Sequence, residues 1–317
     1  MKIDVVITWV DGNVPAHKAK MQKFVKPNEQ QADDIAGKTR YASVGEIFYC
    51  VASILRFAPF VRKIFIVTDE QNPNLDSFID KYFPKNTIPI EIIDHKIIFR
   101  GYENFLPVFN SLSIETFMWR IPDLSENFIY MNDDCFIMRP ISESDWLVDD
   151  KIVAVGNWRN ILIDRTISNI KPRKNNKRPF GYKDSLMNTA DILQIKGRYF
   201  YNEHTPMPMH RSDFEHYFSK NPQAFFDNAN HKFRHPTQFN LQEFIVLYNS
   251  LHKKLIVHSA ECFLFINHVK RGESYIQRKI RKFESDKRIK FCCIGSLDLA
   301  SEKNQKIAFD WLKTVLL

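Results

Sequence analysis

The sequence predicts an α/β fold with a largely parallel sheet. The first reason is that short β-branched runs alternate with segments of helical spacing through the first half of the chain. The second is that these runs end in turn or acidic residues. The third is that 317 residues with 44% hydrophobic content can enclose one large core or two smaller ones, while only 9 glycines argue against long glycine-built loops.

Four buried strands are expected in the first half, each a short apolar run: 3–8, 61–70, 88–95 and 126–134. Residues 12–40 are polar and basic, which indicates an excursion from the core. From Val44 the apolar side chains recur every three or four residues, which predicts a helix that Pro59 ends. A second helix is predicted over 110–122, closed by Pro122. The order strand, helix, strand favours a Rossmann-like core.

The second half is less regular, and several elements or segments are expected in it. They are a strand at 151–158, a basic loop-like stretch at 165–200, two short helices broken at Pro222, a helix in "NLQEFIVLYNSL", one or two strands in "KLIVHSAECFLFINH", and a terminal helix capped by Ser301. We therefore divide the chain into three parts. They are a core (1–160), a basic loop or flap (161–200), and a smaller, mostly helical C-terminal part (201–317) that completes the core.

Net charge is +8, and a basic surface attracts nucleic acid, anionic lipid or phosphorylated small molecules. The densest basic run, "KPRKNNKR" at 171–178, is compatible with a solvated loop, a flap over an anionic ligand, or a membrane-surface contact. The sequence has no recognised nucleic-acid motif, so we expect no nucleic-acid partner. Oligomeric state cannot be predicted from these features.

The cysteines and the hydropathy of the sequence indicate the cellular compartment of the protein. The five cysteines include no CxxC pair, so neither a structural zinc site nor a disulfide framework is expected, and reduced thiols fit the cytosol. The N-terminal apolar run is too short for a signal peptide, and no stretch reaches the ~20 apolar residues of a membrane span. We expect a cytoplasmic protein, with peripheral contact at the inner membrane face as an open alternative.

Acidic residues follow three of the expected strands: Asp11, Asp69, and the pair Asp133 and Asp134. If the sheet is parallel, the carboxyl ends of its strands meet at one edge, where ligands bind in such folds. Carboxylates packed together repel one another, and a hard cation removes that cost. Because Mg²⁺ prefers carboxylate oxygens and keeps positions for phosphates, this edge predicts a metal and diphosphate site. Without other polar groups nearby, one Asp could simply cap a turn.

Polar groups that could complete this site are expected in the second half of the chain. Histidine suits proton transfer near neutral pH, and arginine suits phosphate recognition. The candidates are His204 and His210 in "NEHTPMPMHR", and His231, Arg234 and His235 in "ANHKFRHPTQF". Neither GxGxxG nor GxxxxGK[ST] occurs, which disfavours kinases, P-loop ATPases and Rossmann dehydrogenases.

Several of these segments together resemble the conserved regions of the Stealth family. They are "IDVVITWVDGN", "FAPFVRKIFIVTDEQNP", "LPVFNSLSIETFMWRIPDLSENFIYMNDDCFIMRPI", "HTPMPMHR" and "HKFRHPTQF". The resemblance implies a nucleotide-sugar-binding core and transfer of a sugar-1-phosphate from a UDP-sugar to an acceptor sugar hydroxyl. UMP would be released and a phosphodiester formed, with Mg²⁺ or Mn²⁺ as cofactor, in capsular or exopolysaccharide synthesis.

The resemblance also implies roles for individual residues. The donor would be bound by Asp11, Gly12, Arg40 and Asn132, the metal ion by Asp133 and Asp134, and catalysis would involve His204 as base, Arg234 on the phosphoryl oxygens, Glu115 and Asp134. The last family region departs from its usual Cys-hydrophobic-Asn-Asp: Gly295 and Ser296 stand at the Asn and Asp positions, and Asp298 is the acid that could substitute. The alternative function is a metal-dependent glycosyltransferase, which would make a glycosidic bond from a UDP-sugar.

Overall fold

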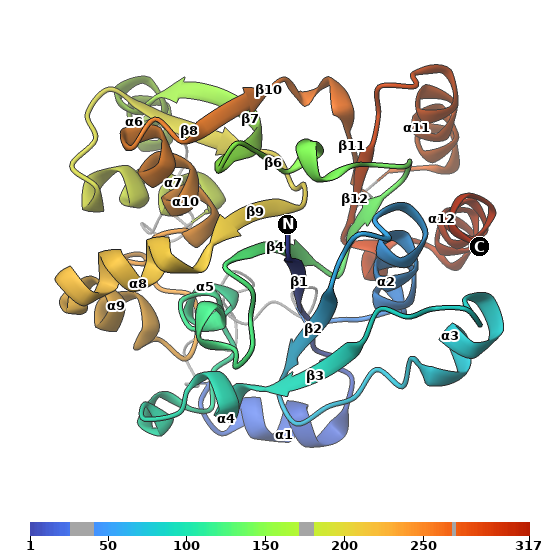
Figure 1. Cartoon of the computed structure of the whole chain (residues 1–317), viewed down its shortest axis with the longest axis horizontal. Coiled ribbons are helices and arrows are strands. Elements are labelled where there is room, and N and C mark those ends of the chain that lie inside the picture. The colour runs from blue at the N-terminus through green and yellow to red at the C-terminus, as the bar shows by residue number, and fades with distance from the viewer. Residues whose placement is uncertain (26–40, 171–180, 268–270) are drawn as a thin grey trace.

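The computed structural model describes residues 1–25, 41–170, 181–267 and 271–317. Its main sheet has the strand order β3-β2-β1-β4-β9 (Figure 1). The bounds of these strands are β1 (Ile3–Thr8), β2 (Lys63–Thr68), β3 (Ile90–Asp94), β4 (Asn127–Asn132) and β9 (Met207–His210). The strands β1 to β4 run parallel and β9 is antiparallel to β4, so the predicted largely parallel sheet is confirmed.

The strand order reverses at β1, which has β2 on one side and β4 on the other. Side chains on both faces of β1 are buried, as expected for a parallel strand covered on both sides. One of them is Asp4, whose carboxylate accepts hydrogen bonds of 2.8 and 2.7 Å from the Arg62 guanidinium near the amino ends of the strands. The opposite, carboxyl ends of β1 and β4 are therefore the place where a ligand crevice is expected.

Two smaller sheets complete the fold. One has the order β10-β7-β6 with β8 paired to β7, and the other has the order β11-β12-β5. The bounds are β5 (Cys135–Ile137), β6 (Leu147–Val148), β7 (Lys151–Asn160), β8 (Arg198–Asn202), β10 (Leu255–His258), β11 (Phe263–Asn267) and β12 (Phe291–Gly295). Since β5 follows β4 after two residues, the turn made by Asp133 and Asp134 joins the main sheet to the β11-β12-β5 sheet.

Helices cover both faces and the ends of the sheets (Figure 1). Their bounds are α1 (Pro15–Gln22), α2 (Glu46–Phe57), α3 (Asp76–Tyr82), α4 (His95–Ile98), α5 (Ser111–Glu115), α6 (Ile161–Ile170), α7 (Tyr182–Ile192), α8 (Arg211–Lys220), α9 (Pro222–Ala229), α10 (Leu241–Leu251), α11 (Glu273–Ser285) and α12 (Glu302–Leu316). The predicted cap of α12 is confirmed, because Ser301 Oγ accepts from the Asn304 N–H at 3.3 Å. No helix among the described residues is both long and apolar enough to cross a bilayer.

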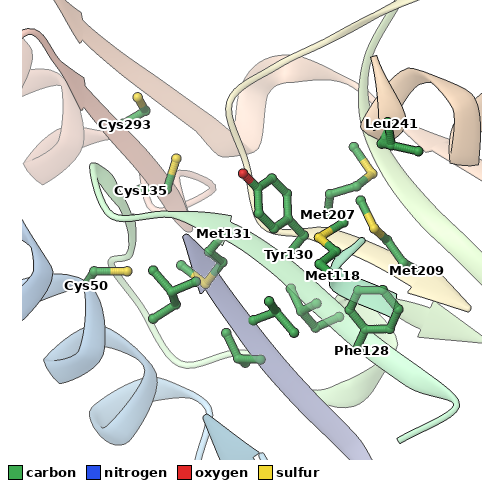
Figure 2. Packing of buried hydrophobic residues seen from close by; sticks show 14 of the residues in the cluster. Cys50, Met118, Phe128, Tyr130, Met131, Cys135, Met207, Met209, Leu241 and Cys293 are labelled. Atoms are coloured by element: carbon green, nitrogen blue, oxygen red, sulfur yellow. The ribbon is translucent and has the colours of Figure 1, made fainter. Parts of the chain in front are cut away.

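Apolar side chains from distant segments meet beside β4 (Figure 2). The register places Phe128 opposite Met209 and Tyr130 opposite Met207 across β4 and β9. Leu241 at the start of α10 is fully buried in the same cluster. The C-terminal part therefore supplies both a strand of the main sheet and part of its core. The three-part division of the chain itself stays a prediction.

Two local predictions were wrong. The stretch 165–200 is not loop-like, because α6, α7 and β8 occupy most of its described part. Leu186, Met187 and Ala190 of α7 are buried, but they stand among polar residues that hide the helical spacing. The basic run 171–178 lies outside the described residues.

The predicted helix at 110–122 is also shorter than expected. It divides into α5 and a 3₁₀ turn at Met118–Arg120. Thr116 lies at the break, where its hydroxyl donates to the Leu112 carbonyl at 2.7 Å and its carbonyl accepts from the Trp119 indole N–H at 2.9 Å. Such local bonds compete with a continuous helix.

Candidate functional site

A cavity of about 420 Å³ lies at the carboxyl ends of β1 and β4. Thr8 and Asn132, which pair at the ends of these two strands, both line it. Its carboxyl, imidazole and guanidinium groups come from seven separate segments: His17, Glu46, His95, Asp133 with Asp134, His204, Arg234 and Asp298. The crevice thus occupies the point where the strand order reverses, and the acid pair predicted from the sequence lies in it together with His204 and Arg234.

The acid pair is held by the turn between β4 and β5. The Asp134 carbonyl accepts from the Ile294 N–H at 3.0 Å, which ties this turn to β12. The Asp134 carboxylate lies 3.6 Å from the Cys135 thiol and 3.5 Å from the Cys293 thiol. The pair therefore has a fixed backbone, and one carboxylate of the two has hydrogen-bond donors on both oxygens.

Four carboxyl groups influence one another in this cavity. Burial raises the pKa of Asp133 well above its usual range, and the charges of Asp134 and Glu46 raise it further. Burial also raises the pKa of Glu46, and Asp134 and Asp298 add to the effect. A divalent cation relieves this repulsion, and Mg²⁺ needs only one or two carboxylates alongside water and phosphate oxygens. The donor set therefore fits a hard divalent ion.

Glu115 lies behind this cavity, at the end of α5. A smaller hollow of about 180 Å³ is lined by Glu115, Tyr182 and Gln242, and it shares Asn132, His204 and Arg234 with the larger cavity. The Tyr130 hydroxyl lies 3.2 Å from Glu115 Oε1 and 2.9 Å from Asn132 Oδ1. Burial raises the pKa of Glu115 to about 7, although the Arg234 charge acts against the shift. Glu115 can therefore change protonation state near neutral pH.

His204 and Arg234 reach the cavity from different segments. The His204 ring lies between Tyr182 and Phe265, with ring centroids 5.3 and 5.9 Å away. Its positive charge, when protonated, acts on Asp134 and opposes the effect of burial on that carboxyl's pKa. Arg234 donates from Nη2 to Ser111 Oγ at 3.0 Å, which holds the guanidinium at the start of α5.

The other candidate histidines lie elsewhere. His210 pairs with Asn127 at the amino end of β4, about 16 Å along the strand from Asn132. His231 and His235 stack on each other with ring centroids 4.3 Å apart, and neither lines the two cavities described above. His204 is therefore the one of the four sequence candidates that the fold brings to the acid pair.

The acids after β1 and β2 do not line the cavity. Asp11 Oδ1 accepts from the Asn13 N–H at 2.8 Å and so stabilises a turn. Asp69 accepts from the Lys20 ammonium at 2.9 Å and contacts His17 Nδ1 at 3.2 Å. Burial opposes ionisation of Asp69, but these two hydrogen bonds together with the charges of His95 and Lys20 outweigh it and lower its pKa to about 2. Arg40 lies outside the described residues, and donor binding by Asp11 and Gly12 stays a prediction.

Gly12 allows a close approach of two segments beside the cavity. Its N–H donates to the Tyr41 carbonyl at 2.5 Å, and a Cβ at this position would lie 2.4 Å from Tyr41 Cβ. Tyr41 lines the cavity and donates from its hydroxyl to the Phe109 carbonyl at 2.6 Å. Gly12 is thus required for the position of Tyr41.

We expect Gly12→Ala to lower the free energy of unfolding by about 1–3 kcal/mol, because the added methyl group has no space. Urea denaturation followed by circular dichroism measures this difference. Gly272→Ala is the matched control, since a Cβ there meets no atom within 4 Å. Equal stability of the two variants would contradict the packing role of Gly12.

Two histidines of the cavity were not predicted from the sequence. His17 lies on α1, in the stretch taken for a polar excursion, and His95 follows β3. Both are buried, and burial lowers the pKa of His95 to about 4. Each has one buried ring nitrogen without a hydrogen-bond partner among the described residues. An isolated histidine in a polar stretch carries no spacing signal, so only the fold places these rings in the cavity.

Comparisons with known proteins show which proteins this chain is similar to. Residues 40–155 match the model of Stealth protein CR2, conserved region 2, and residues 1–26 match that of Stealth protein CR1, conserved region 1. The capsular polysaccharide phosphotransferase LcbA of Neisseria meningitidis is 30% identical over 83% of this chain and 69% of its own length. The capsular polysaccharide phosphotransferase cps1A of Actinobacillus pleuropneumoniae is 30% identical over 77% of this chain, and the match spans 64% of that relative.

A solved structure is similar in fold. The bifunctional glycosyltransferase WbbM in its apo form superposes with a TM-score of 0.51 at 9% identity, over 97% of this chain and 51% of that one. At this identity the likeness concerns the α/β fold alone.

Proposed function

The chain belongs to the Stealth family, and from this premise we propose that it transfers a sugar-1-phosphate from a UDP-sugar to an acceptor sugar hydroxyl. The product is a phosphodiester of a capsular or exopolysaccharide, and UMP is released. One observation carries the proposal: Asp133, Asp134, His204 and Arg234 line a single cavity at the carboxyl ends of β1 and β4. The relatives are named capsular polysaccharide phosphotransferases, which supports the same reaction class.

Asp133 and Asp134 would hold a divalent ion, Mg²⁺ or Mn²⁺, whose charge neutralises the donor diphosphate. Arg234 binds the oxygens of the transferred phosphoryl group, and its bond to Ser111 orients the guanidinium before substrate arrives. Such preorganised charge is worth most where negative charge develops during transfer. The residues of this cavity thus serve positioning and electrostatics, which is what phosphoryl transfer requires.

His204 acts as the general base. A neutral ring nitrogen accepts the proton of the acceptor hydroxyl while the new oxygen–phosphorus bond forms and the bond to the UMP oxygen breaks. The negative charge of Asp134 stabilises the resulting imidazolium. Packing between Tyr182 and Phe265 limits the movement of the ring and so orients the nitrogen that accepts the proton.

Glu115 orients the sugar from the smaller hollow, and its protonation gives a prediction that does not need turnover. Its pKa rises from 4.5 in the unfolded chain to about 7 in the fold, so the folded state binds the extra proton. The contribution of Glu115 is then fully present below pH 4.5 and is lost as pH rises toward 7. Between pH 4.5 and 7, Glu115 should lower the free energy of unfolding of the wild type by about 3 kcal/mol. We expect the Glu115→Gln variant not to show this decrease.

Urea denaturation of the wild type and the Glu115→Gln variant at several pH values measures this effect. Subtracting the two curves removes the opposite contribution of His95, whose lowered pKa makes stability rise with pH between 4 and 6.5. Parallel curves for the two proteins would contradict the raised pKa of Glu115.

The reaction itself is tested by its products. The full chain is incubated with a panel of UDP-sugars, an acceptor saccharide and Mg²⁺, and phosphorus NMR follows the nucleotide. UMP together with a phosphodiester signal is expected. UDP together with a glycosidic bond would support the alternative, a metal-dependent glycosyltransferase.

A further inference from the structure

Two cysteines distant in sequence meet beside Asp134. Cys135 begins β5 and Cys293 is the third residue of β12, and the antiparallel register pairs them directly. Directly paired residues of neighbouring strands project to the same face of a sheet. Figure 2 shows the Cys135 and Cys293 side chains as neighbours. The potential ligand atoms of Asp134, Cys135 and Cys293 all lie within 4.8 Å of one another.

We propose that Asp134, Cys135 and Cys293 form a binding site for a thiophilic divalent cation, Zn²⁺ being the natural example. Ligand atoms around tetrahedral zinc stand about 3.5–4 Å apart, given metal–sulfur bonds of about 2.3 Å, so this cluster closes with small adjustments. Both thiols release a proton to solvent as the metal–sulfur bonds form. Two thiolates and one carboxylate exceed the charge of the ion by one, so the complex carries a net charge of −1.

The cluster has an accessible fourth position. Asp134 and Cys293 both line the large cavity, whereas Cys135 is enclosed behind them and its thiol lies 3.3 Å from the His204 carbonyl oxygen. Three protein ligands with one position open to a cavity are typical of zinc sites that bind water or substrate. The ion therefore enters from the cavity and keeps a water or substrate oxygen as its fourth ligand.

This site is different from the proposed magnesium site although it shares one residue with it. Thiolates select soft cations such as Zn²⁺ and Cd²⁺, while carboxylate and phosphate oxygens select Mg²⁺ and Mn²⁺. Asp133 serves only the oxygen-ligand site, and the two cysteines serve only the thiolate site. Because Asp134 belongs to both, a thiophilic cation should displace Mg²⁺ and inhibit the transfer. This consequence rests on the proposed function, but the binding does not.

Cd²⁺ titration of the reduced 317-residue chain tests the binding without any turnover. A thiolate-to-Cd²⁺ charge-transfer band should appear in the ultraviolet and saturate at one equivalent. Cys135→Ser and Cys293→Ser should each weaken the binding at least about tenfold, because each removes one sulfur ligand. The matched control is Cys262→Ser: this half-buried thiol donates to the Ser259 carbonyl and lies outside the cluster, so its loss should leave the band unchanged.

A further variant separates the two metal sites. Asp133→Asn should weaken Mg²⁺ binding and keep the Cd²⁺ band, whereas the two serine variants should do the reverse. If the serine variants do not fold, X-ray absorption of the wild-type Zn²⁺ complex replaces them and should show two sulfur ligands. A folded wild type without the band, a band that survives in both serine variants, or a zinc shell with fewer than two sulfurs would overturn the proposal. None of these outcomes bears on UMP release.

Discussion

Asp134→Asn is expected to reduce turnover of a UDP-sugar by about a thousandfold or more. The substitution keeps the size of the side chain and removes the charge that would hold the divalent ion, whose neutralisation of the diphosphate is worth several kcal/mol. It also leaves one oxygen in place of the two that contact Cys135 and Cys293. Isothermal titration with Mg²⁺ should show the loss of affinity in parallel with the loss of turnover.

Two variants make this result specific. Asp149→Asn is the neutral control, because Asp149 is exposed and its φ of 48° is one that asparagine adopts readily. Asp298→Asn tests whether this cavity acid replaces the Asn-Asp of the last family region, and a fall in Mg²⁺ affinity would support that replacement. An Asp134→Asn protein that still requires Mg²⁺ and works at the normal rate would exclude Asp134 from metal binding.

The acid pair could be predicted from sequence because its signal is local. An apolar strand ending in "NDD" fixes the chemistry and the place of Asp133 and Asp134, since the end of a parallel strand is the edge of the sheet. The same argument failed for Asp69. A polar helix, α1, supplies His17 and Lys20, and both contact the carboxylate of Asp69, which follows β2. No periodicity in 12–25 indicated that contact.

The contact between the two cysteines could not be predicted from the sequence. Cys135 and Cys293 are 158 positions apart, and their meeting depends on a register between β5 and β12 that spacing rules cannot supply. A search for the CxxC motif detects metal sites whose two cysteines lie in one turn. It does not detect ligands that face each other across two strands of a sheet. Long-range strand pairing likewise turned β9 into the fifth strand of the main sheet. The fold class followed from local patterns, whereas these contacts required the three-dimensional structure.

His204→Gln should lower kcat by about 10²–10⁴ and leave the KM for the UDP-sugar nearly unchanged. In the proposed mechanism the base acts on the acceptor hydroxyl in the transition state, while donor binding would depend on the acid pair and Arg234. Glutamine retains a polar side chain between Tyr182 and Phe265 but cannot take up a proton at neutral pH. Steady-state kinetics over a range of pH measures both constants, and the acidic limb that reports the base should disappear.

His17→Gln is the matched comparison, because His17 lines the same cavity and is held at Nδ1 by Asp69, as a catalytic histidine would be. If His204 is the base, the His17 variant keeps the acidic limb and most of its kcat. A loss of less than about tenfold in the His204 variant corresponds to under about 1.4 kcal/mol of barrier, too little for a base. A large loss of kcat in the His17 variant instead would indicate that His17 accepts the proton of the acceptor hydroxyl. The base would then lie on α1, on the side of the cavity near Asp69.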